Sequence, residues 1–378
     1  MKKHTLISIL TFLLFGIIFN VQCSHVHKQS KPASSQAPYK EMDEQIAKYV
    51  ADNHIPGIAY GVVKGNQMIW SGAAGWANIE QKTPMSIDGI INIASISKTF
   101  TATAVMQLWE KGMLSLETDV NEYLPTPIRN PHHPDVPITI FQLLTHTSSI
   151  ADGESYGASY ASGDPIVSLE EWIQNYLIPE GRYYDAASNF HSWKPGIGND
   201  YSNVGFGLLG YIVEQVANTP FNLYCKTHIL DPLGMDNSGW FLYEIDTLKH
   251  ITPYEDQHPL SLYSFPNYPD GLLRTSVREL SYFLLAMING GEYNNVRILK
   301  ESTLKIMLKA QIEEDRSQGL CWGMIGFKSL WGHSGGDPGV GTYMYFSPKT
   351  KIGVITFQNN HNGDLLGVFR RLYNTAEE

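Results

Sequence analysis

Cysteine is scarce in this chain: of 378 residues, only Cys23, Cys225 and Cys321 are cysteines. A framework of several disulfides is therefore excluded, and the two cysteines after Cys23 offer no metal site. For Cys225 and Cys321 two alternatives stay open, one bridge or two unpaired buried thiols, because a core of this size does not require a bridge.

Charged residues are few, at 17 % of the chain, and the 27 Lys and Arg are outnumbered by 37 Asp and Glu. Residues 1–40 hold five lysines and no acid, so residues 41–378 carry a formal charge of −15. Such a surface repels phosphate backbones, and no stripe of basic residues offsets it, so nucleic acid is excluded as an expected partner. With 43 % hydrophobic residues the chain is globular, and its length suggests two units or one composite domain.

Long hydrophobic runs are limited to residues 5–19, which follow the basic start Lys2 and Lys3. This run is shorter than the about 20 residues of a membrane span and is typical of a signal peptide. We therefore expect a signal peptide over residues 1–23, a polar tether over 24–40 and an exported domain over 41–378, periplasmic or extracellular. Cleavage after Cys23 and lipid anchoring to a membrane at Cys23 remain alternatives, because Asn20-Val21-Gln22-Cys23 is a poor lipoprotein motif.

Two hairpins are predicted near the chain ends, one over residues 57–65 and 67–75 and one over 342–346 and 351–357. Helical patterns flank them at residues 41–53 and 364–375 and fill the middle of the chain, at 98–111, 138–144, 169–177, 204–217 and 277–289. The expected fold class is α/β, an antiparallel sheet built from both chain ends and flanked by helices, with an inserted mostly helical lobe. The sheet lobe would cover about 41–90 and 290–378 and the helical lobe about 91–289.

A long segment, residues 148–200, is rich in Gly, Ser, Tyr and Trp and includes Tyr156 and Tyr160. Long loops in compact domains are often functional, so this segment is a candidate wall of a pocket. The alternative is that its aromatic side chains fill the core of the helical lobe.

Ser95 and Lys98 are the first candidate catalytic pair, in Ser95-Ile96-Ser97-Lys98 at the start of a predicted helix. Residues at i and i+3 share a helix face, so the hydroxyl and the amine can meet. The helix N-terminus favours an anion at Ser95 and is expected to lower the pKa of Lys98, which would make a neutral amine available to activate the serine. The alternative is an N-cap serine beside a solvated lysine.

Two further segments carry polar groups between apolar stretches. Tyr201 and Asn203, two apart before a predicted helix, can point the same way; a tyrosine hydroxyl can pass protons and an asparagine amide can orient a substrate or the lysine. His333, Gly335 and Gly336 lie in a predicted edge strand, where glycine lets the backbone approach a substrate and offer an N–H to an oxyanion. An ordinary turn is the alternative for each segment.

Ser95-x-x-Lys98, Tyr201-x-Asn203 and His333-x-Gly335, in this order, resemble the three signatures of the serine β-lactamase and penicillin-binding-protein superfamily. Within it the chain is similar to the class C branch and its esterase and D-aminopeptidase relatives. Residues 138–148, 232–235 and 335–339 also match family stretches, and the resemblance runs from about residue 42 to residue 360. It implies a β-lactamase/transpeptidase-like fold and a serine hydrolase that needs no metal and no organic cofactor.

By this resemblance Ser95 is the acylated nucleophile, Lys98 its proton acceptor and Tyr201 the proton shuttle to the leaving group. Asn203 orients Lys98 and the acyl amide, and the N–H groups of Ser95 and Gly336 form the oxyanion hole.

His333 departs from the family pattern because it stands where many members have lysine. A histidine with an ordinary pKa of about 6.5 is mostly neutral at pH 7, so recognition of a substrate carboxylate should be weaker. Gln142 and Arg274 also depart from the usual residues, without an assignable consequence.

Other candidate residues carry less chemistry. Ser155, in Gly153-Glu154-Ser155-Tyr156-Gly157, fits a nucleophile elbow, but no apolar strand precedes it and no helix start is expected after it. His132 and His133 lie in a loop without a metal-site pattern. His146 and His191 are expected to be structural, satisfied by backbone hydrogen bonds.

The sequence thus predicts an exported serine hydrolase that cleaves an ester or amide in a small-molecule or peptide substrate. One alternative is a β-lactamase or D,D-carboxypeptidase acting on cell-wall peptides, and another is a penicillin-binding sensor or surface protein that acylates without turnover. The oligomeric state is not determined by the sequence.

Overall fold

The computed structural model describes residues 37–313 and 315–378. Contacts divide the chain into units 1–31 and 32–378, and the fold described below belongs to the second unit. The expected signal peptide, Cys23 and most of the expected tether lie outside the described residues, whereas residues 37–40 of that tether begin the helix α1 (Ala37–Asp52). Within the described part of the chain, no helix combines the length and apolarity needed to cross a membrane.

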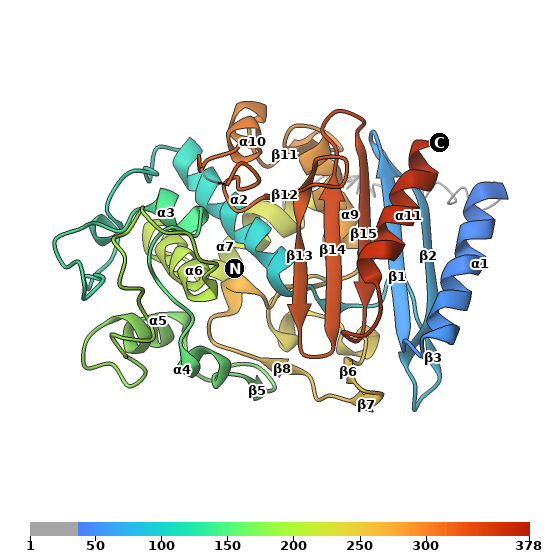
Figure 1. The fold of residues 1–378 in the computed structure, drawn as a ribbon, viewed down its shortest axis with the longest axis horizontal. Helices are drawn as coiled ribbons and strands as arrows, with labels where there is room; N and C mark the ends of the chain where they lie inside the picture. The colour runs from blue at the N-terminus through green and yellow to red at the C-terminus, as the bar shows by residue number, and fades with distance from the viewer. Residues whose placement is uncertain (1–36, 314) are drawn as a thin grey trace, which may run out of the picture. The chain divides into compact units, whose positions relative to one another are not determined.

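A seven-stranded antiparallel sheet, in the order β12-β13-β14-β15-β1-β2-β3, joins the two ends of the described chain (Figure 1). Strand β1 pairs with β15 along its length, with Ile58 opposite Gln358. The predicted sheet from both chain ends is therefore confirmed. Its strands are β1 (Gly57–Lys64), β2 (Gln67–Asn78), β3 (Thr83–Pro84), β12 (Gly323–Ile325), β13 (Leu330–Asp337), β14 (Val340–Phe346) and β15 (Ile352–Gln358).

Both faces of the sheet are covered. Helices α1 and α11 (Leu365–Glu377) pack on one face, where Val354 of β15 joins their apolar cluster. Helix α9 (Val277–Ile288) packs on the other face with Ile355 and Phe357. Every residue of β15 is therefore buried, as expected for a central strand. The sequence assigned α9 to the helical lobe, but its apolar stripe covers the sheet.

The helical part lies beyond β13 and is built around α2 (Ser97–Glu110) (Figure 1). Twelve consecutive residues of α2, from Ser97 to Leu108, are buried, so this helix is surrounded by protein and holds its N-terminus firmly. Phe100 of α2 stacks on Phe283 of α9, with ring centroids 3.9 Å apart, and so joins the helices to the sheet. The helices near α2 are α3 (Ile140–Leu144), α5 (Leu169–Leu177), α6 (Asn203–Ala217) and α7 (Phe221–Cys225).

Short elements complete the unit. They are the 3-10 turns η1 (Ala94–Ile96) and η6 (Tyr268–Asp270), the helices α4 (Glu154–Gly157), α8 (Asp231–Leu233) and α10 (Glu301–Met307), and the strand pairs β4 (Ile91–Asn92) with β9 (Arg274–Thr275), β5 (Ala161–Ser162) with β8 (Tyr263–Ser264), β6 (Tyr254–Glu255) with β7 (His258–Pro259), and β10 (Glu292–Tyr293) with β11 (Val296–Arg297).

Local capping explains one boundary that the apolar pattern misplaced. The helix predicted over 138–144 begins only at Ile140, because Thr139 and Gln142 form a capping box. The Thr139 hydroxyl accepts from the Gln142 N–H at 3.2 Å, and the Gln142 side-chain oxygen accepts from the Thr139 N–H at 3.0 Å. Gln142 therefore acts as a helix cap. Of the two alternatives for Cys225 and Cys321, the structure has two buried free thiols.

Candidate active site

Ser95 lies in the turn η1, directly before the buried helix α2. The preceding residue, Ala94, has φ +47°, a left-handed conformation that is strained for a residue with a Cβ and occurs often at functional sites. Strand β13 runs against this turn: a Cβ on Gly335 would lie 2.5 Å from the Ile93 carbonyl oxygen and 2.9 Å from the Ala94 Cβ. Glycine at 335 therefore permits β13 to approach the turn that carries Ser95, whereas the predicted approach of this backbone to a substrate stays a prediction.

Lys98 has no solvent-exposed surface, and its amine lies among three acceptors. Its Nζ donates to Ser95 Oγ at 3.1 Å, to Asn203 Oδ1 at 2.6 Å and to the Asp270 backbone carbonyl at 2.8 Å. These bonds use all three protons of an ammonium group. The predicted pairing of Ser95 and Lys98 on one helix face is thus present in the structure.

Tyr201, in the loop before α6, and Asn203, the first residue of α6, come together with this pair. The Lys98 amine lies 4.9 Å from the centroid of the Tyr201 ring, and Tyr201 is 42 % exposed. The ring of His146 also lies near that ring, with centroids 4.4 Å apart. Four side chains from two distant segments therefore converge at one partly exposed point.

The charge state of Lys98 differs from the sequence-based expectation. Burial lowers its pKa, but the interactions with Tyr201, Asp270 and Asp152 together outweigh this effect, so the pKa is raised. The prediction of a lowered pKa was wrong because it considered the helix terminus and not the carboxylates brought in by tertiary contacts. Burial also raises the pKa of Tyr201, against the opposing charge of Lys98. The resting pair at neutral pH is an ammonium and a phenol.

His333 lies on β13 with its ring centroid 6.3 Å from that of Tyr201. Its Nδ1 is 2.6 Å from the Ser334 carbonyl oxygen, which can only accept, so Nδ1 carries the proton and Nε2 is left as an acceptor. Burial and the nearby charge of Lys98 lower the pKa of His333 to about 4. The ring is therefore uncharged at neutral pH.

The sequence predicted that the strand carrying His333 and Gly336 is the edge strand of the sheet. In the structure this strand, β13, is the second strand from the edge. Strand β12 pairs with β13, but only with Leu330, Trp331 and Gly332. From His333 to Asp337, β13 pairs with β14 alone, so this half of the strand still has an open edge. Gly336 is exposed there, and its part in an oxyanion hole stays a prediction.

Two buried carboxyl groups that the sequence analysis did not identify lie beside the site. Asp270 is 1 % exposed and accepts from the Tyr156 hydroxyl at 2.7 Å; burial raises its pKa to about 6. Asp337 is 8 % exposed and accepts from the Tyr160 hydroxyl at 2.9 Å and from Asn92 Nδ2 at 3.0 Å; burial raises its pKa to about 7. No local sequence signal marks these acids, because their burial depends on segments far apart in the chain.

The segment 148–200 fills part of the core of the helical part, as one of the two alternatives held, because Trp172 and Tyr176 are buried there. Its Tyr156 and Tyr160 donate to the carboxyl groups beside the site, and its role as the wall of a pocket stays a prediction. Asp152 of the same segment accepts from Asn203 and is a further contact that the sequence did not reveal.

The buried acid Asp337 predicts a pH-dependent stability. An aspartic acid whose pKa is raised in the folded state binds its proton more tightly there, so it stabilises the fold at low pH and this contribution is lost as the pH rises through about 7. Asp337→Asn imitates the protonated acid. We expect the Tm of this variant, relative to the wild type, to increase between about pH 5 and pH 8 in thermal unfolding. A constant difference would show that Asp337 does not titrate in this range.

The remaining candidates have local roles. Ser155 lies inside the short helix α4, which begins before it at Glu154, so no helix starts directly after Ser155, as expected. The rings of His132 and His133 donate to the carbonyls of Ala186 and Ser192. His146 accepts the Ser202 N–H at 3.1 Å, as predicted.

His191 does not have the backbone partner that was expected. Its Nε2 contacts the carboxylate of Asp200 at 2.9 Å, so that prediction was wrong. The two residues lie on one loop that folds back on itself. No cluster of three His, Cys, Asp or Glu side chains suited to a metal occurs in the part of the chain that the structure describes.

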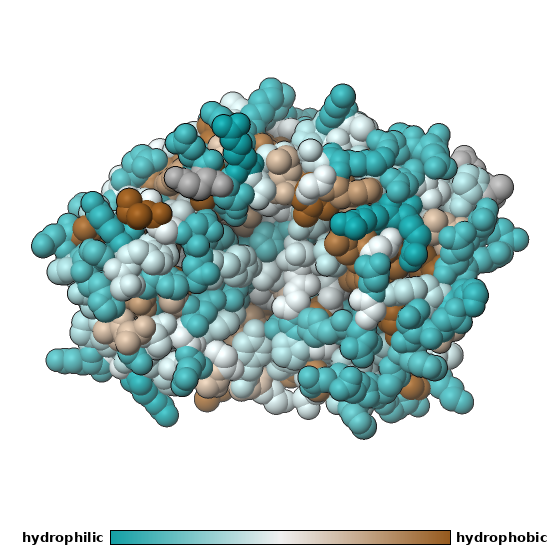
Figure 2. Space-filling model, viewed as in Figure 1, coloured by the Kyte–Doolittle hydropathy of each residue, from teal (hydrophilic) through white to brown (hydrophobic). Residues whose placement is uncertain are grey.

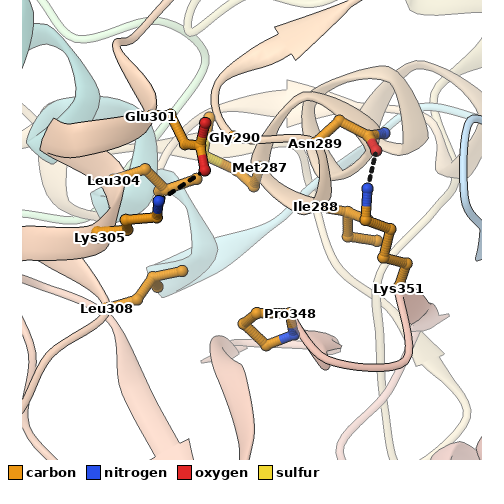
Figure 3. Close-up of a pocket in the computed structure, with 10 residues that line it drawn as sticks. All are labelled: Met287, Ile288, Asn289, Gly290, Glu301, Leu304, Lys305, Leu308, Pro348 and Lys351. Carbon is orange, nitrogen blue, oxygen red and sulfur yellow. Dashed lines mark hydrogen bonds and ion pairs between the residues drawn. The ribbon is translucent and has the colours of Figure 1, made fainter.

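Figure 2 shows a hollow between the helices and β13, where pale residues of intermediate hydropathy gather among mostly hydrophilic ones. A separate cavity of about 410 Å³ lies between α9, α10 and the turn that leads into β15 (Figure 3). Its lining includes Glu301, paired with Lys305 at 2.7 Å, and Lys351, which donates to Asn289 at 3.4 Å. None of the residues around Ser95 contributes to it.

Comparison with known proteins decides the family. A family model described as Beta-lactamase matches residues 42–373. The chain belongs to this family.

The chain is 29 % identical over 315 residues to "Beta-lactamase-like protein 2" of Dictyostelium discoideum, covering 79 % of this chain and 54 % of that protein. It is 24 % identical over 327 residues to "Protein flp" of Staphylococcus aureus strain N315, covering 85 % of this chain and 63 % of that protein. The chain thus spans between about half and two thirds of the length of these relatives.

Solved structures agree with the fold. The octameric penicillin-binding protein homologue from Pyrococcus abyssi has a TM-score of 0.70 and 26 % identity, over 88 % of this chain and 76 % of that one. The β-lactamase/D-alanine carboxypeptidase from Pseudomonas syringae has a TM-score of 0.72 and 20 % identity, over 91 % and 99 % of the two chains. The D-amino acid amidase from Ochrobactrum anthropi has a TM-score of 0.70 and 21 % identity, over 90 % and 98 %. The β-lactamase/transpeptidase-like fold that the motifs implied is confirmed.

Proposed function

We propose that the protein is an exported serine hydrolase that cleaves an ester or amide bond through an acyl-enzyme at Ser95. The observation that carries this proposal is the contact of the buried Lys98 Nζ with the half-buried Ser95 Oγ at 3.1 Å. A serine hydroxyl is a weak nucleophile by itself and needs a base within hydrogen-bond reach. Membership of the Beta-lactamase family, and relatives named as amidase and carboxypeptidase, support the same reaction class.

The proposed reaction uses Ser95, Lys98 and Tyr201 in sequence, with Asn203 holding the Lys98 amine. The Ser95 oxygen attacks the substrate carbonyl carbon while its proton passes to the Lys98 amine in its neutral form. The tetrahedral anion is stabilised by the N–H groups of Ser95 and Gly336. The Tyr201 phenol then protonates the leaving alcohol or amine as the carbonyl–leaving-group bond breaks, and it regains a proton from the Lys98 ammonium. Water adds to the Ser95 ester, and the acid leaves while the Ser95 hydroxyl is restored.

Lys98 has to release a proton before it can accept one from Ser95. Because its pKa is raised in the resting protein, the competent form grows as the pH increases. The proposed enzyme should therefore show a value of kcat/KM that rises with pH, in contrast to the neutral amine that the sequence suggested.

The substrate class follows from the electrostatics of His333. A neutral ring offers an acceptor at Nε2 and no positive charge, so it does not attract a carboxylate as a lysine would. The proposed substrates are esters, amides or peptides that lack a carboxylate at the position facing residue 333. A β-lactamase or D,D-carboxypeptidase acting on cell-wall peptides is the second candidate, favoured by the named relatives.

Side-by-side assays separate these candidates. Hydrolysis of a short-chain aryl ester without cephalosporin turnover would support the proposal, and Ser95-dependent turnover of a chromogenic cephalosporin would favour the second candidate. A protein that forms a stable Ser95 adduct, detected by mass spectrometry, and never returns to free enzyme would be an acylating sensor or surface protein. Fractionation of the producing cell tests export separately.

His333 gives a pH prediction for the same assay. Between about pH 5 and pH 8, His333 itself should add no step to the ratio of kcat/KM for a carboxylate-bearing ester to that for a matched uncharged ester, because the ring remains uncharged above its pKa of about 4. The ratio removes the titration of Lys98, which affects both substrates. Asp270 and Asp337 titrate at about pH 6 and about pH 7, so His333→Gln, which keeps both acids, is the reference. His333→Lys should raise the ratio. A fall in the wild-type ratio near pH 6.5 that is absent from His333→Gln would contradict the neutral ring.

A further inference from the structure

Asp152 makes more hydrogen bonds to the start of α6 than a helix cap requires. Its Oδ2 accepts from both the backbone N–H of Asn203, at 2.9 Å, and the side-chain Nδ2 of Asn203, at 2.8 Å. Its Oδ1 accepts from the Val204 N–H at 2.9 Å and lies 3.4 Å from the Ser202 hydroxyl. The carboxylate therefore binds the side chain of a site residue as well as the helix terminus.

The contact with Nδ2 decides which way the Asn203 amide faces. A carboxylate only accepts, so the NH₂ end of the amide points to Asp152 and the oxygen points to Lys98, at 2.6 Å. The flipped amide would place its oxygen against the carboxylate and its NH₂ against the ammonium. Both contacts would then be repulsive, so Asp152 selects one orientation.

The backbone around Asp152 is itself held in place. The Ala151 N–H donates to the Asn189 carbonyl at 2.9 Å, and the buried Tyr176 hydroxyl donates to the Ala151 carbonyl at 3.1 Å. On the other side of Asp152, the Gly153 N–H donates to the same hydroxyl at 2.5 Å. The carboxylate is thus presented from a fixed segment, as effective positioning requires.

We propose that Asp152 is a positioning residue that fixes the Asn203 amide and, through it, the Lys98 amine beside Ser95. This inference rests on the proposed hydrolase function and extends it to a residue outside the three signature segments. The competing explanation is a purely structural role, since a carboxylate at a helix N-terminus stabilises the helix.

The coupling between Asp152 and Asn203 is the readout that a helix cap would not move, whereas the charge of Asp152 acts on Lys98 in either role. The titratable groups around Lys98 are Tyr201, Asp152, Asp270, Asp337, His146, His333 and Cys321. Burial lowers the pKa of both histidines and raises that of the thiol, so near neutral pH the negative charges come from the aspartates. Removing Asp152 should therefore lower the pKa of Lys98. The rise of kcat/KM with pH, called the acid limb of the pH profile below, should then occur at lower pH.

The test compares Asp152→Asn, Asp152→Glu and Ser168→Ala in the full chain with an aryl ester substrate. Asp152→Asn should lower kcat/KM by roughly 10- to 100-fold, the usual effect of an outer-shell partner, and shift the acid limb to lower pH. Asp152→Glu keeps the charge but displaces it, so the limb should stay while the rate falls. Ser168 accepts the Glu171 N–H at the start of α5, so Ser168→Ala removes a cap and should change neither the rate nor the limb.

A double-mutant cycle completes the test. If Asp152 acts through Asn203, Asp152→Asn should cause little further loss in rate when Asn203 is already alanine. Independent, multiplying losses would reduce Asp152 to a helix cap and overturn the inference, whatever the position of the acid limb. If Asp152→Asn does not fold, the coupling of Asp152→Glu to Asn203→Ala still decides. A wild type without Ser95-dependent turnover or Ser95 labelling by a fluorophosphonate probe would instead overturn the proposed function.

Discussion

Ser95→Ala is expected to reduce ester hydrolysis at least ~10³-fold, because removal of the nucleophile of a covalent mechanism leaves only binding and oxyanion stabilisation. The fold should be retained, since Ser95 is half-buried in a turn and its hydroxyl contacts other side chains of the site, Lys98 among them, and no core residue. Initial rates with a saturating aryl ester, and the mass of the protein after incubation with a slow substrate, provide the measurement. The acyl adduct should be absent from the variant.

Ser155→Ala is the matched control. Ser155 sits in a pattern that also fits a nucleophile, but it lies on α4 and has none of the contacts found at Ser95. Its replacement should leave the rate of ester hydrolysis within about twofold of the wild type, as is usual for a substitution outside the core and away from the site. Equal losses in the two variants, or unchanged turnover in Ser95→Ala, would contradict the assignment of the nucleophile.

Lys98→Met is expected to lower kcat/KM by about 10²- to 10⁴-fold, the usual contribution of a positioned acid or base. Methionine fills a similar volume and carries no charge, so the protein should still fold. The positive charge of Lys98 holds down the pKa of Asp270, so in this variant the pKa of Asp270 should rise above about 6 and the carboxyl become neutral instead of remaining an unpaired charge.

Lys111→Met serves as its control, because Lys111 ends the same helix and is exposed. Activity of this variant should match the wild type. Circular dichroism and thermal unfolding of both variants establish that any loss at Lys98 is chemical. If Lys98→Met hydrolysed the ester at the wild-type rate, Ser95 would have to be activated by a different base, and the proposed proton path would be wrong.

The local sequence predicted most of the elements near the site. Residues 169–177 form the expected helix because Ser168 caps it and its apolar residues share one face. The hairpin around Gly65 follows from a short turn between two β-branched runs, and Gly65 has the expected positive φ of +62°. The spacing of Ser95 and Lys98 placed their side chains together for the same reason, because the pair lies within one turn of chain.

The electrostatics of the site could not be predicted in this way. The lowered pKa expected for Lys98 considered only its own helix, whereas Asp270 and Asp152 approach it from two other segments. Asp337 lies in a stretch that resembles the family, yet its burial beside Tyr160 depends on a loop almost half the chain away. Charge interactions depend on distance in space, and the sequence pattern gives no such distances.

The sequence by itself therefore determined the antiparallel sheet joined from both chain ends and the helix that follows Ser95, since these follow from short-range periodicity and spacing. The set of polar side chains around Ser95 followed from the resemblance of three segments to the signatures of the superfamily. Only the tertiary structure decided that Lys98 rests as an ammonium, that His333 is neutral and that Asp152 orients Asn203. These properties arise where segments far apart in the chain bury charges next to one another, and burial and proximity together set which groups hold a proton.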